Sequence, residues 1–243
     1  MKTFQISYPL TNREFLKVIS NSFSAFLDSG TSRSTKKLKP LHGAIARDLA
    51  EKLGRGFGVV SQGYGDDRDG SIEGRYMPKN VDITVTKNGK AIAGVAVKFI
   101  MQNYSQNSNN YFENMLGETA NIRCNRHPYF QIFIILDRLP YYTKEKDISR
   151  WESFTRHNAD KYITLSDDNV DVYFHTPNKT LMYVIHIPDN DSIRNLTQYR
   201  DYYISLDSGV ELSSSPLGDH GDSIIVNDYE EFIEKVYHTI LSL

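Results

Sequence analysis

The chain has 243 residues, a formal net charge of −2 and 40% hydrophobic residues, which suits one good-sized globular domain. Its single cysteine, Cys124, excludes a disulfide framework, and its apolar runs stay short of the ~20 residues of a membrane helix. The chain start, MKTFQISYPL, lacks the apolar stretch of a signal peptide, so we expect a cytoplasmic protein with no membrane association. The near-neutral charge excludes a global basic signature for nucleic-acid binding. Local basic clusters remain at residues 33–39 and at Arg123, Arg126 and Arg138, although solvated surface also explains them.

The first quarter of the chain predicts two helices followed by a strand. Helical spacing of apolar residues follows a capping box at the first helix, and Pro40 and Gly54 supply the start and stop signals of the second. Residues 63–74 are rich in glycine and aspartate, which predicts a solvated turn. The expected elements are helices at 12–27 and 41–53 and a core strand at 57–62.

Residues 77–100 predict a two-stranded hairpin. Apolar and polar residues alternate over 81–86, Asn88-Gly89 is a strong hairpin-turn signal, and a mostly apolar strand returns over 91–100. Asp82 and Lys98 are charged residues within this apolar unit. Charges buried in a core are costly unless they meet each other, a metal or a ligand. A cross-strand ion pair on a solvated face is the simplest explanation, and a functional site is the alternative.

The hairpin resembles the catalytic hairpin of the PD-(D/E)XK nuclease superfamily, which includes the type II restriction endonucleases. The family pattern is Pro-Asp on one strand, then an acid, a spacer and a lysine on the next. Here Pro78 precedes Asp82 with three residues between them, and Ala96-Val97-Lys98 supplies the second half with alanine in place of the acid. Several restriction enzymes of the family take that acid from the following helix instead.

Two glutamates in the predicted helix over residues 109–122 could replace the missing acid. Glu113 and Glu118 lie ~140° apart at 100° per residue, so only one is expected to reach the hairpin. Glu113 matches the spacing of the family better, and we expect it to be the second acid.

The resemblance implies a restriction-endonuclease-like α/β fold, with a central mixed β-sheet flanked by helices on both faces. Residues 1–243 would form a single nuclease domain, with N-terminal helices at 12–53, a catalytic core at about 41–136 and a part at 140–243 for recognition or dimerisation. The implied activity is Mg²⁺-dependent, site-specific cleavage of double-stranded DNA by a homodimer. Another nuclease of the superfamily (repair, structure-specific or toxin) and a DNA-binding protein that has lost catalysis are the alternatives.

The implied site residues follow from the same resemblance. Asp82, Glu113 and the carbonyl of Val97 would hold Mg²⁺, whose preferred ligands are oxygens. Lys98 would assist the attacking water or orient the phosphate. Asp48 or Glu51, on the helix before the sheet, would add a ligand, although an ordinary polar helix face explains both.

The polar segment over residues 102–110 follows Lys98 directly. Asparagine and glutamine side chains pair bidentately with adenine in the major groove, but they are also common in loops. We expect this segment to be a loop beside the cleavage site. The candidate DNA-binding residues are Asn103, Gln106, Asn107, Asn109 and Asn110.

The second half of the chain carries no motif that names a chemistry. The apolar run YFQIFIIL predicts a central strand covered on both faces. The histidines show no zinc-ligand spacing, and Cys124 has no partner acid for a thiol hydrolase. The expected elements are strands at 129–136, 170–174 and 180–187, helices at 147–160 and 191–204, and a C-terminal helix after Asp228.

Overall fold

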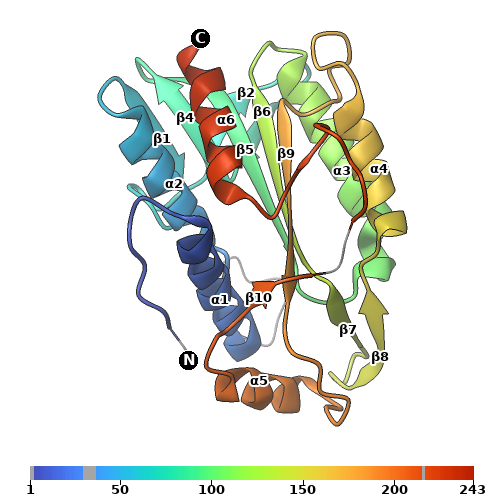
Figure 1. Cartoon of the computed structure of the whole chain (residues 1–243). Helices are drawn as coiled ribbons and strands as arrows, with labels where there is room; N and C mark the ends of the chain where they lie inside the picture. Colours follow the sequence, from blue (N-terminus) through green and yellow to red (C-terminus); the bar gives the residue numbers. More distant parts are fainter. Residues whose placement is uncertain (1–2, 30–36, 215–216) are drawn as a thin grey trace.

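The computed structural model describes residues 3–29, 37–214 and 217–243, which form a mixed sheet with helices on both faces (Figure 1). This confirms the α/β fold class that the sequence predicted. The six helices of the described residues are α1 (Asn12–Ser29), α2 (Lys39–Leu53), α3 (Tyr104–Arg123), α4 (Arg156–Asp167), α5 (Leu196–Ser205) and α6 (Tyr229–Leu241). None of these described helices is long and apolar enough to cross a membrane.

The main sheet has seven strands, with the order β1-β4-β5-β6-β9-β10 and β11 also pairing with β9. Strands β5, β6 and β9 run parallel at its centre, while β1 and β4 are antiparallel on one side. These strands are β1 (Phe57–Ser61), β4 (Ile83–Lys87), β5 (Lys90–Ile100), β6 (Tyr129–Leu136), β9 (Lys179–His186), β10 (Glu211–Leu212) and β11 (Ile225–Val226). Two further pairs are β2 (Gly70–Glu73) with β3 (Pro78–Val81), and β7 (Arg138–Tyr142) with β8 (Ile148–Ser153).

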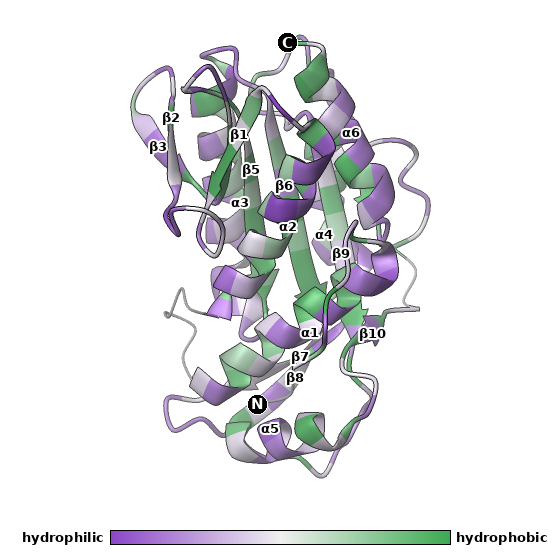
Figure 2. Ribbon diagram, turned by 90° about the vertical axis from the view of Figure 1, so that its left-hand side faces the viewer, coloured by the Kyte–Doolittle hydropathy of each residue, from purple (hydrophilic) through white to green (hydrophobic). Residues whose placement is uncertain are grey.

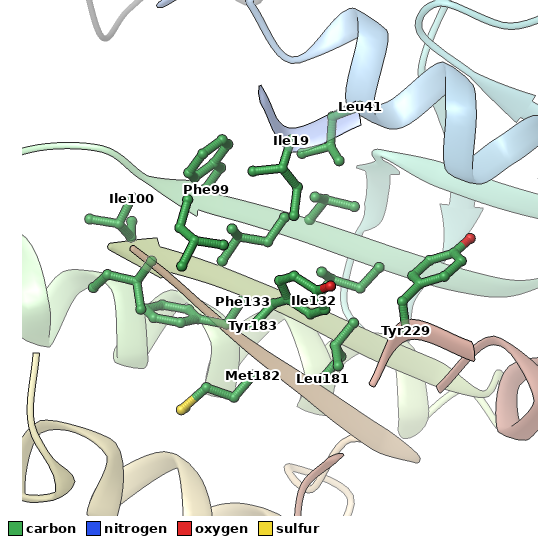
Figure 3. Close-up of a cluster of buried hydrophobic side chains, with 14 of the residues drawn as sticks. Ile19, Leu41, Phe99, Ile100, Ile132, Phe133, Leu181, Met182, Tyr183 and Tyr229 are labelled. Atoms are coloured by element: carbon green, nitrogen blue, oxygen red, sulfur yellow. The ribbon is translucent and has the colours of Figure 1, made fainter. Parts of the chain in front are cut away.

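Buried aromatic and aliphatic side chains fill both spaces between the sheet and its helices (Figure 3). On one face, Phe99 meets Phe23 of α1, and Phe15 stacks on Tyr229 of α6. On the other face, Phe133 contacts Tyr162 of α4. Helices α1, α2 and α6 therefore cover one face, and α3 and α4 cover the other. Because both faces are covered, all eight residues of β6 are buried, as the apolar run predicted.

The hairpin around Asn88-Gly89 is confirmed. Asn88 and Gly89 both have positive φ, 53° and 75°, as a tight hairpin turn with native strand twist requires. Strands β4 and β5 pair on either side of it. One detail differs from the expectation, because the incoming strand is interrupted at Asp82, where β3 ends and β4 begins.

Several predicted boundaries were wrong for physical reasons. Residues 147–160 are not one helix, because Trp151 pairs opposite Pro140 in the β7–β8 ladder and α4 begins only after the Thr155 cap. Residues 170–174 form turns rather than a strand, since the Arg123 guanidinium takes the carbonyl oxygens of residues 170, 173 and 176. The expected turn at 63–74 contains β2, which finds its partner in β3. The expected loop at 102–110 is mostly the start of α3.

Candidate active site beside strand β5

A cleft opens where strand β4 parts from strand β5. The last β4–β5 pair joins Ile83 to Val95, whereas the β5–β6 pairing continues to Ile100. One edge of residues 96–100 therefore faces a cavity of about 520 Å³ instead of a neighbouring strand. Asp82, Val97, Lys98 and Glu118 all line this cavity.

Asp82 occupies the point where the two strands separate. Its Oδ2 accepts a hydrogen bond from the Val97 N–H at 2.8 Å, so the side chain replaces the missing ladder partner. Its backbone carbonyl accepts a hydrogen bond from Ser61 Oγ at 2.6 Å, which fixes the bend. Burial raises the pKa of Asp82. His42 and the Val97 hydrogen bond oppose this increase, and the charges of Asp69 and Glu118 add smaller increases. About a third of the side chain, 34%, still reaches the cleft.

His42 of α2 lies behind Asp82. Its Nδ1 is 3.9 Å from Asp82 Oδ1, too far for a hydrogen bond. Burial lowers the pKa of His42, and the negative charges of Asp82 and Asp69 only partly offset this decrease. The neutral imidazole is therefore favoured at pH 7. His42 Nε2 and Asp69 Oδ1 are buried without a hydrogen-bond partner. Among the described residues, Asp82 Oδ1 has no hydrogen-bond donor within bonding distance, so the carboxylate retains the capacity to bind a ligand.

Two lysines bring positive charge to the cavity. Lys98 is exposed on β5, and its Nζ lies 4.9 Å from the centre of the Tyr111 ring. Lys37 is buried, with Nζ 5.1 Å from the Phe26 ring centre. Burial and the charge of Lys98 lower the pKa of Lys37 to about 8. Of the predicted basic cluster, residues 33–36 lie outside the described residues.

The structure brings Glu118 rather than Glu113 to the cleft. Tyr111, Asn114, Met115 and Glu118 line the cavity, at the spacing of one helical face. Glu113 lies on the other flank of α3, exposed, and its charge acts on Lys161 of α4. The expectation for Glu113 relied on spacing along the chain, whereas the helical phase of α3 decides which glutamate faces β5.

Glu118 has two partners in the cleft. Lys79 of β3 forms an ion pair with it at 2.6 Å, and the Tyr129 hydroxyl donates to it at 3.4 Å. Neither Lys79 nor Tyr129 was named from the sequence. Lys79 stands inside the Pro-Lys-Asn-Val-Asp segment, two residues before Val81. Its place on the same strand face as an apolar core residue is a signal that the sequence contains. Gln131 of β6, which the sequence analysis did not single out either, also lines the cavity. It is the β6 neighbour of Ala96, the position at which the PD-(D/E)XK pattern has its acid.

Asp82, Glu118 and Val97 line the same cavity, and their carboxylate and carbonyl oxygens are the groups there that could hold Mg²⁺. In a β-strand, the N–H and C=O of one residue point to the same edge of the strand. The Val97 carbonyl therefore points to the same side as the Val97 N–H, which donates to Asp82. Two carboxylates and a carbonyl fit Mg²⁺, which keeps several water ligands. Within residues 3–29, 37–214 and 217–243 no three His, Cys, Asp or Glu side chains gather as a metal cluster. Any ion would therefore depend on this smaller donor set.

The expected adenine-reading residues are dispersed along the start of α3. Asn103, with φ 51°, binds the backbone of Tyr142 through both side-chain atoms and joins α3 to β7. Asn109 lies beside Lys161, and Asn107 bonds to Tyr111 at the rim of the cleft. Gln106 accepts a hydrogen bond from Asn103 at 3.4 Å, and Asn110 is exposed. The DNA-binding role of these five residues stays a prediction.

Asp48 and Glu51 do not line the cleft. Asp48 is fully buried and accepts hydrogen bonds from the Leu10 N–H and the Tyr229 hydroxyl. Glu51 pairs with Arg47 on the outer surface of α2. The polar-helix explanation holds for Glu51, and Asp48 has a structural role.

Arg123 and Arg138, expected as a local basic surface, serve the fold. Arg123 is buried against backbone carbonyls, and Arg138 pairs with Asp189 and Asp191.

Comparisons with known proteins found no match to any family model, curated protein or solved structure.

Proposed function

We propose that the protein is a Mg²⁺-dependent type II restriction endonuclease that hydrolyses double-stranded DNA in the cleft beside β5. The observation that carries the proposal is the convergence of Asp82, Glu118 and Lys98 on one cavity, beyond Val95, where β5 loses its β4 partner. Asp82 is a largely buried carboxylate whose pKa burial raises, which is costly without a ligand, and phosphodiester hydrolysis uses two carboxylates with a nearby cation.

The residues of the cleft divide the work by charge. Asp82, Glu118 and the Val97 carbonyl would bind the ion, which supplies charge neutralisation at the phosphate and a more acidic water. Asp82 is held in place by the Val97 N–H through Oδ2, while Oδ1 has no hydrogen bond among the described residues and lies 3.9 Å from His42 Nδ1. Hydrolysis breaks the bond between phosphorus and the 3′ oxygen as water adds to phosphorus.

Lys98 would act on the phosphate or on the attacking water. It lies two residues beyond Ala96 on the same face of β5, and its ammonium projects over the Tyr111 ring. A cation there stabilises the negative charge that develops on the phosphate oxygens. Lys37, with a pKa near 8, adds a second positive charge to the same cavity.

A homodimer belongs to the proposal, because cutting both strands of a symmetric site calls for two active sites related by that symmetry. Analytical ultracentrifugation of the purified chain with a cognate duplex would measure the number of chains per duplex, which we expect to be two. A monomer that nicks or cuts branched DNA would favour a structure-specific nuclease of the same superfamily.

The decisive experiment incubates the purified chain with plasmid and phage DNA in Mg²⁺ or in EDTA. Discrete fragments in Mg²⁺ alone are expected, with loss of cleavage in Asp82→Ala and Lys98→Ala. Glu118→Gln and Glu113→Gln form a matched pair on one helix. Glu118→Gln should remove cleavage, and Glu113→Gln should leave it within about threefold of the parent, since surface changes have small effects. Folded protein with no cutting of any DNA would refute the proposal.

A further inference from the structure

The tip of the β2–β3 hairpin, residues 75–78, presents apolar side chains to solvent. Tyr76 is 78% exposed and Met77 60% exposed, and Tyr76 is the most exposed large hydrophobic residue among those described. Arg75 and Pro78 beside them are exposed as well. Adjacent exposed apolar residues are unfavourable in water unless a partner covers them.

The hairpin tip is held rigidly in this exposed position. The buried side chain of Asn121, on α3, accepts from the Tyr76 N–H at 2.9 Å and donates to the Met77 carbonyl at 2.8 Å. The Asn121 backbone carbonyl accepts from the Arg75 N–H at 2.7 Å. A Cβ on Gly74 would lie 2.1 Å from Asn121 Nδ2, so only glycine permits this close approach.

A separate small core fixes the base of the hairpin. Ile72 of β2 and Val81 of β3 pack with Ile122 of α3 and Tyr129 of β6. Figure 2 shows the β2–β3 hairpin projecting outside the main sheet and its helices. A turn that is ordered before binding loses little conformational entropy when a partner covers it. The exposed apolar side chains of the hairpin tip are therefore well placed to bind a partner.

Chemistry and position both favour a DNA duplex as the partner. Apolar wedges such as Met and Pro are inserted between base steps by proteins that enter the minor groove, and arginine is attracted to a narrow minor groove. The hairpin tip combines these groups in consecutive positions, Arg75-Tyr76-Met77-Pro78. The same strand continues through Lys79, which lines the cleft, to Asp82.

We infer that the hairpin tip is a DNA wedge that enters the groove beside the cleavage site. The inference rests on the proposed function and adds a contact that the cleft does not supply. Met77 and Asp82 are five residues apart. At about 3.3 Å per residue, an extended strand places Met77 up to ~17 Å from Asp82. Since DNA rises about 3.4 Å per base pair, the wedge would enter within about 5 base pairs of the scissile phosphate.

The test measures duplex binding by the full chain in EDTA, which prevents metal-dependent cutting. Fluorescence anisotropy with a labelled duplex compares the parent with Tyr76→Ala combined with Met77→Ser. A loss of affinity of about 5- to 100-fold is expected, as for other aromatic–base contacts. Val172→Ser changes a side chain of matched exposure, 62%, on another turn that does not line the cleft, and should bind like the parent. Thermal melting of both variants checks that they fold.

A second measurement locates the wedge. With 2-aminopurine placed at successive positions around the mapped cut, the parent should raise its fluorescence within about 5 base pairs, because unstacking a base relieves quenching. Tyr76→Phe should retain the rise, and the double variant should lose it. Equal binding and equal fluorescence in parent and double variant would overturn the wedge while leaving the proposed function intact. A parent chain that binds no duplex would overturn both.

Discussion

The junction around Asp48 and the cleft around Asp82 each contain an aspartate whose pKa burial raises. At the junction, both oxygens of Asp48 are satisfied, one by the Leu10 N–H and the other by the Tyr229 hydroxyl. In the cleft, one oxygen of Asp82 binds the Val97 N–H and the other has only His42 at 3.9 Å. Of these two aspartates, Asp48 is saturated by its own protein and contributes to folding, whereas Asp82 keeps one oxygen without a hydrogen bond and is available to a ligand.

Helix α2 links the two regions. It carries Asp48 toward the junction with α6 and His42 toward the cleft, six residues earlier. Substitutions at the two aspartates can be compared directly. We expect substitutions at Asp82 to lower activity and substitutions at Asp48 to lower stability.

The largest difference is expected in cleavage. Asp82→Asn should lower the cleavage rate about 100- to 1000-fold, the usual cost of removing one charge-stabilising group from an active site. Asp48→Asn should cleave like the parent once its lower stability is compensated by working well below its melting temperature. Rates on one plasmid under saturating Mg²⁺ measure both. Equal losses in the two variants would mean that the cleft is not the site.

The reverse difference is expected in stability. Asp48→Ala leaves the Leu10 N–H and the Tyr229 hydroxyl buried and unpaired, which should lower the free energy of unfolding by about 2–3 kcal/mol. Asp82→Ala unpairs the Val97 N–H, but this group lines the open cleft, where water can replace the carboxylate, so the effect should stay within about 1 kcal/mol. Urea titration of both variants provides the comparison. A more severe loss in Asp82→Ala would make that residue structural.

A smaller effect concerns access to Glu118. The Lys79 ammonium occupies Glu118 at 2.6 Å and must leave if a cation binds there. Because this pair is partly exposed, its removal by Lys79→Met should raise Mg²⁺ affinity only about 3- to 10-fold. Calorimetric titration with Mg²⁺ measures it, and Lys90→Met, an exposed lysine outside the cleft, is the control. Unchanged affinity would separate Glu118 from the metal site.

The smallest effect is a pH dependence of the junction. The folded-state pKa of Asp48 is raised above its unfolded value, mainly by burial, so the folded chain binds this proton more tightly than the unfolded chain. Its contribution to stability is full below the unfolded pKa of about 3.9 and is lost as pH rises through the folded pKa. The parent should therefore exceed Asp48→Asn in stability by more at pH 4 than at pH 7. Urea unfolding at both pH values tests the sign.

The sequence alone determined the elements whose signals are local. The Asn88-Gly89 turn, the all-apolar β6 and the amphipathic α1, α2 and α6 depend on side chains within each segment, and the structure confirms them. Asp82 and Lys98 also stood out locally, as charges in an apolar hairpin. The structure places both on one cavity, and the metal and DNA roles stay proposals.

Tertiary structure decided what depends on distant partners. The bend at Asp82 requires Ser61 and Val97, and β2 forms only because β3 is there to pair with it. The choice of Glu118 over Glu113 follows from how α3 rests on β5 and β6, since the two glutamates differ by phase around the helix and not by residue type. Burial and hydrogen-bond saturation, which distinguish Asp48 from Asp82, arise from packing between segments far apart in the chain.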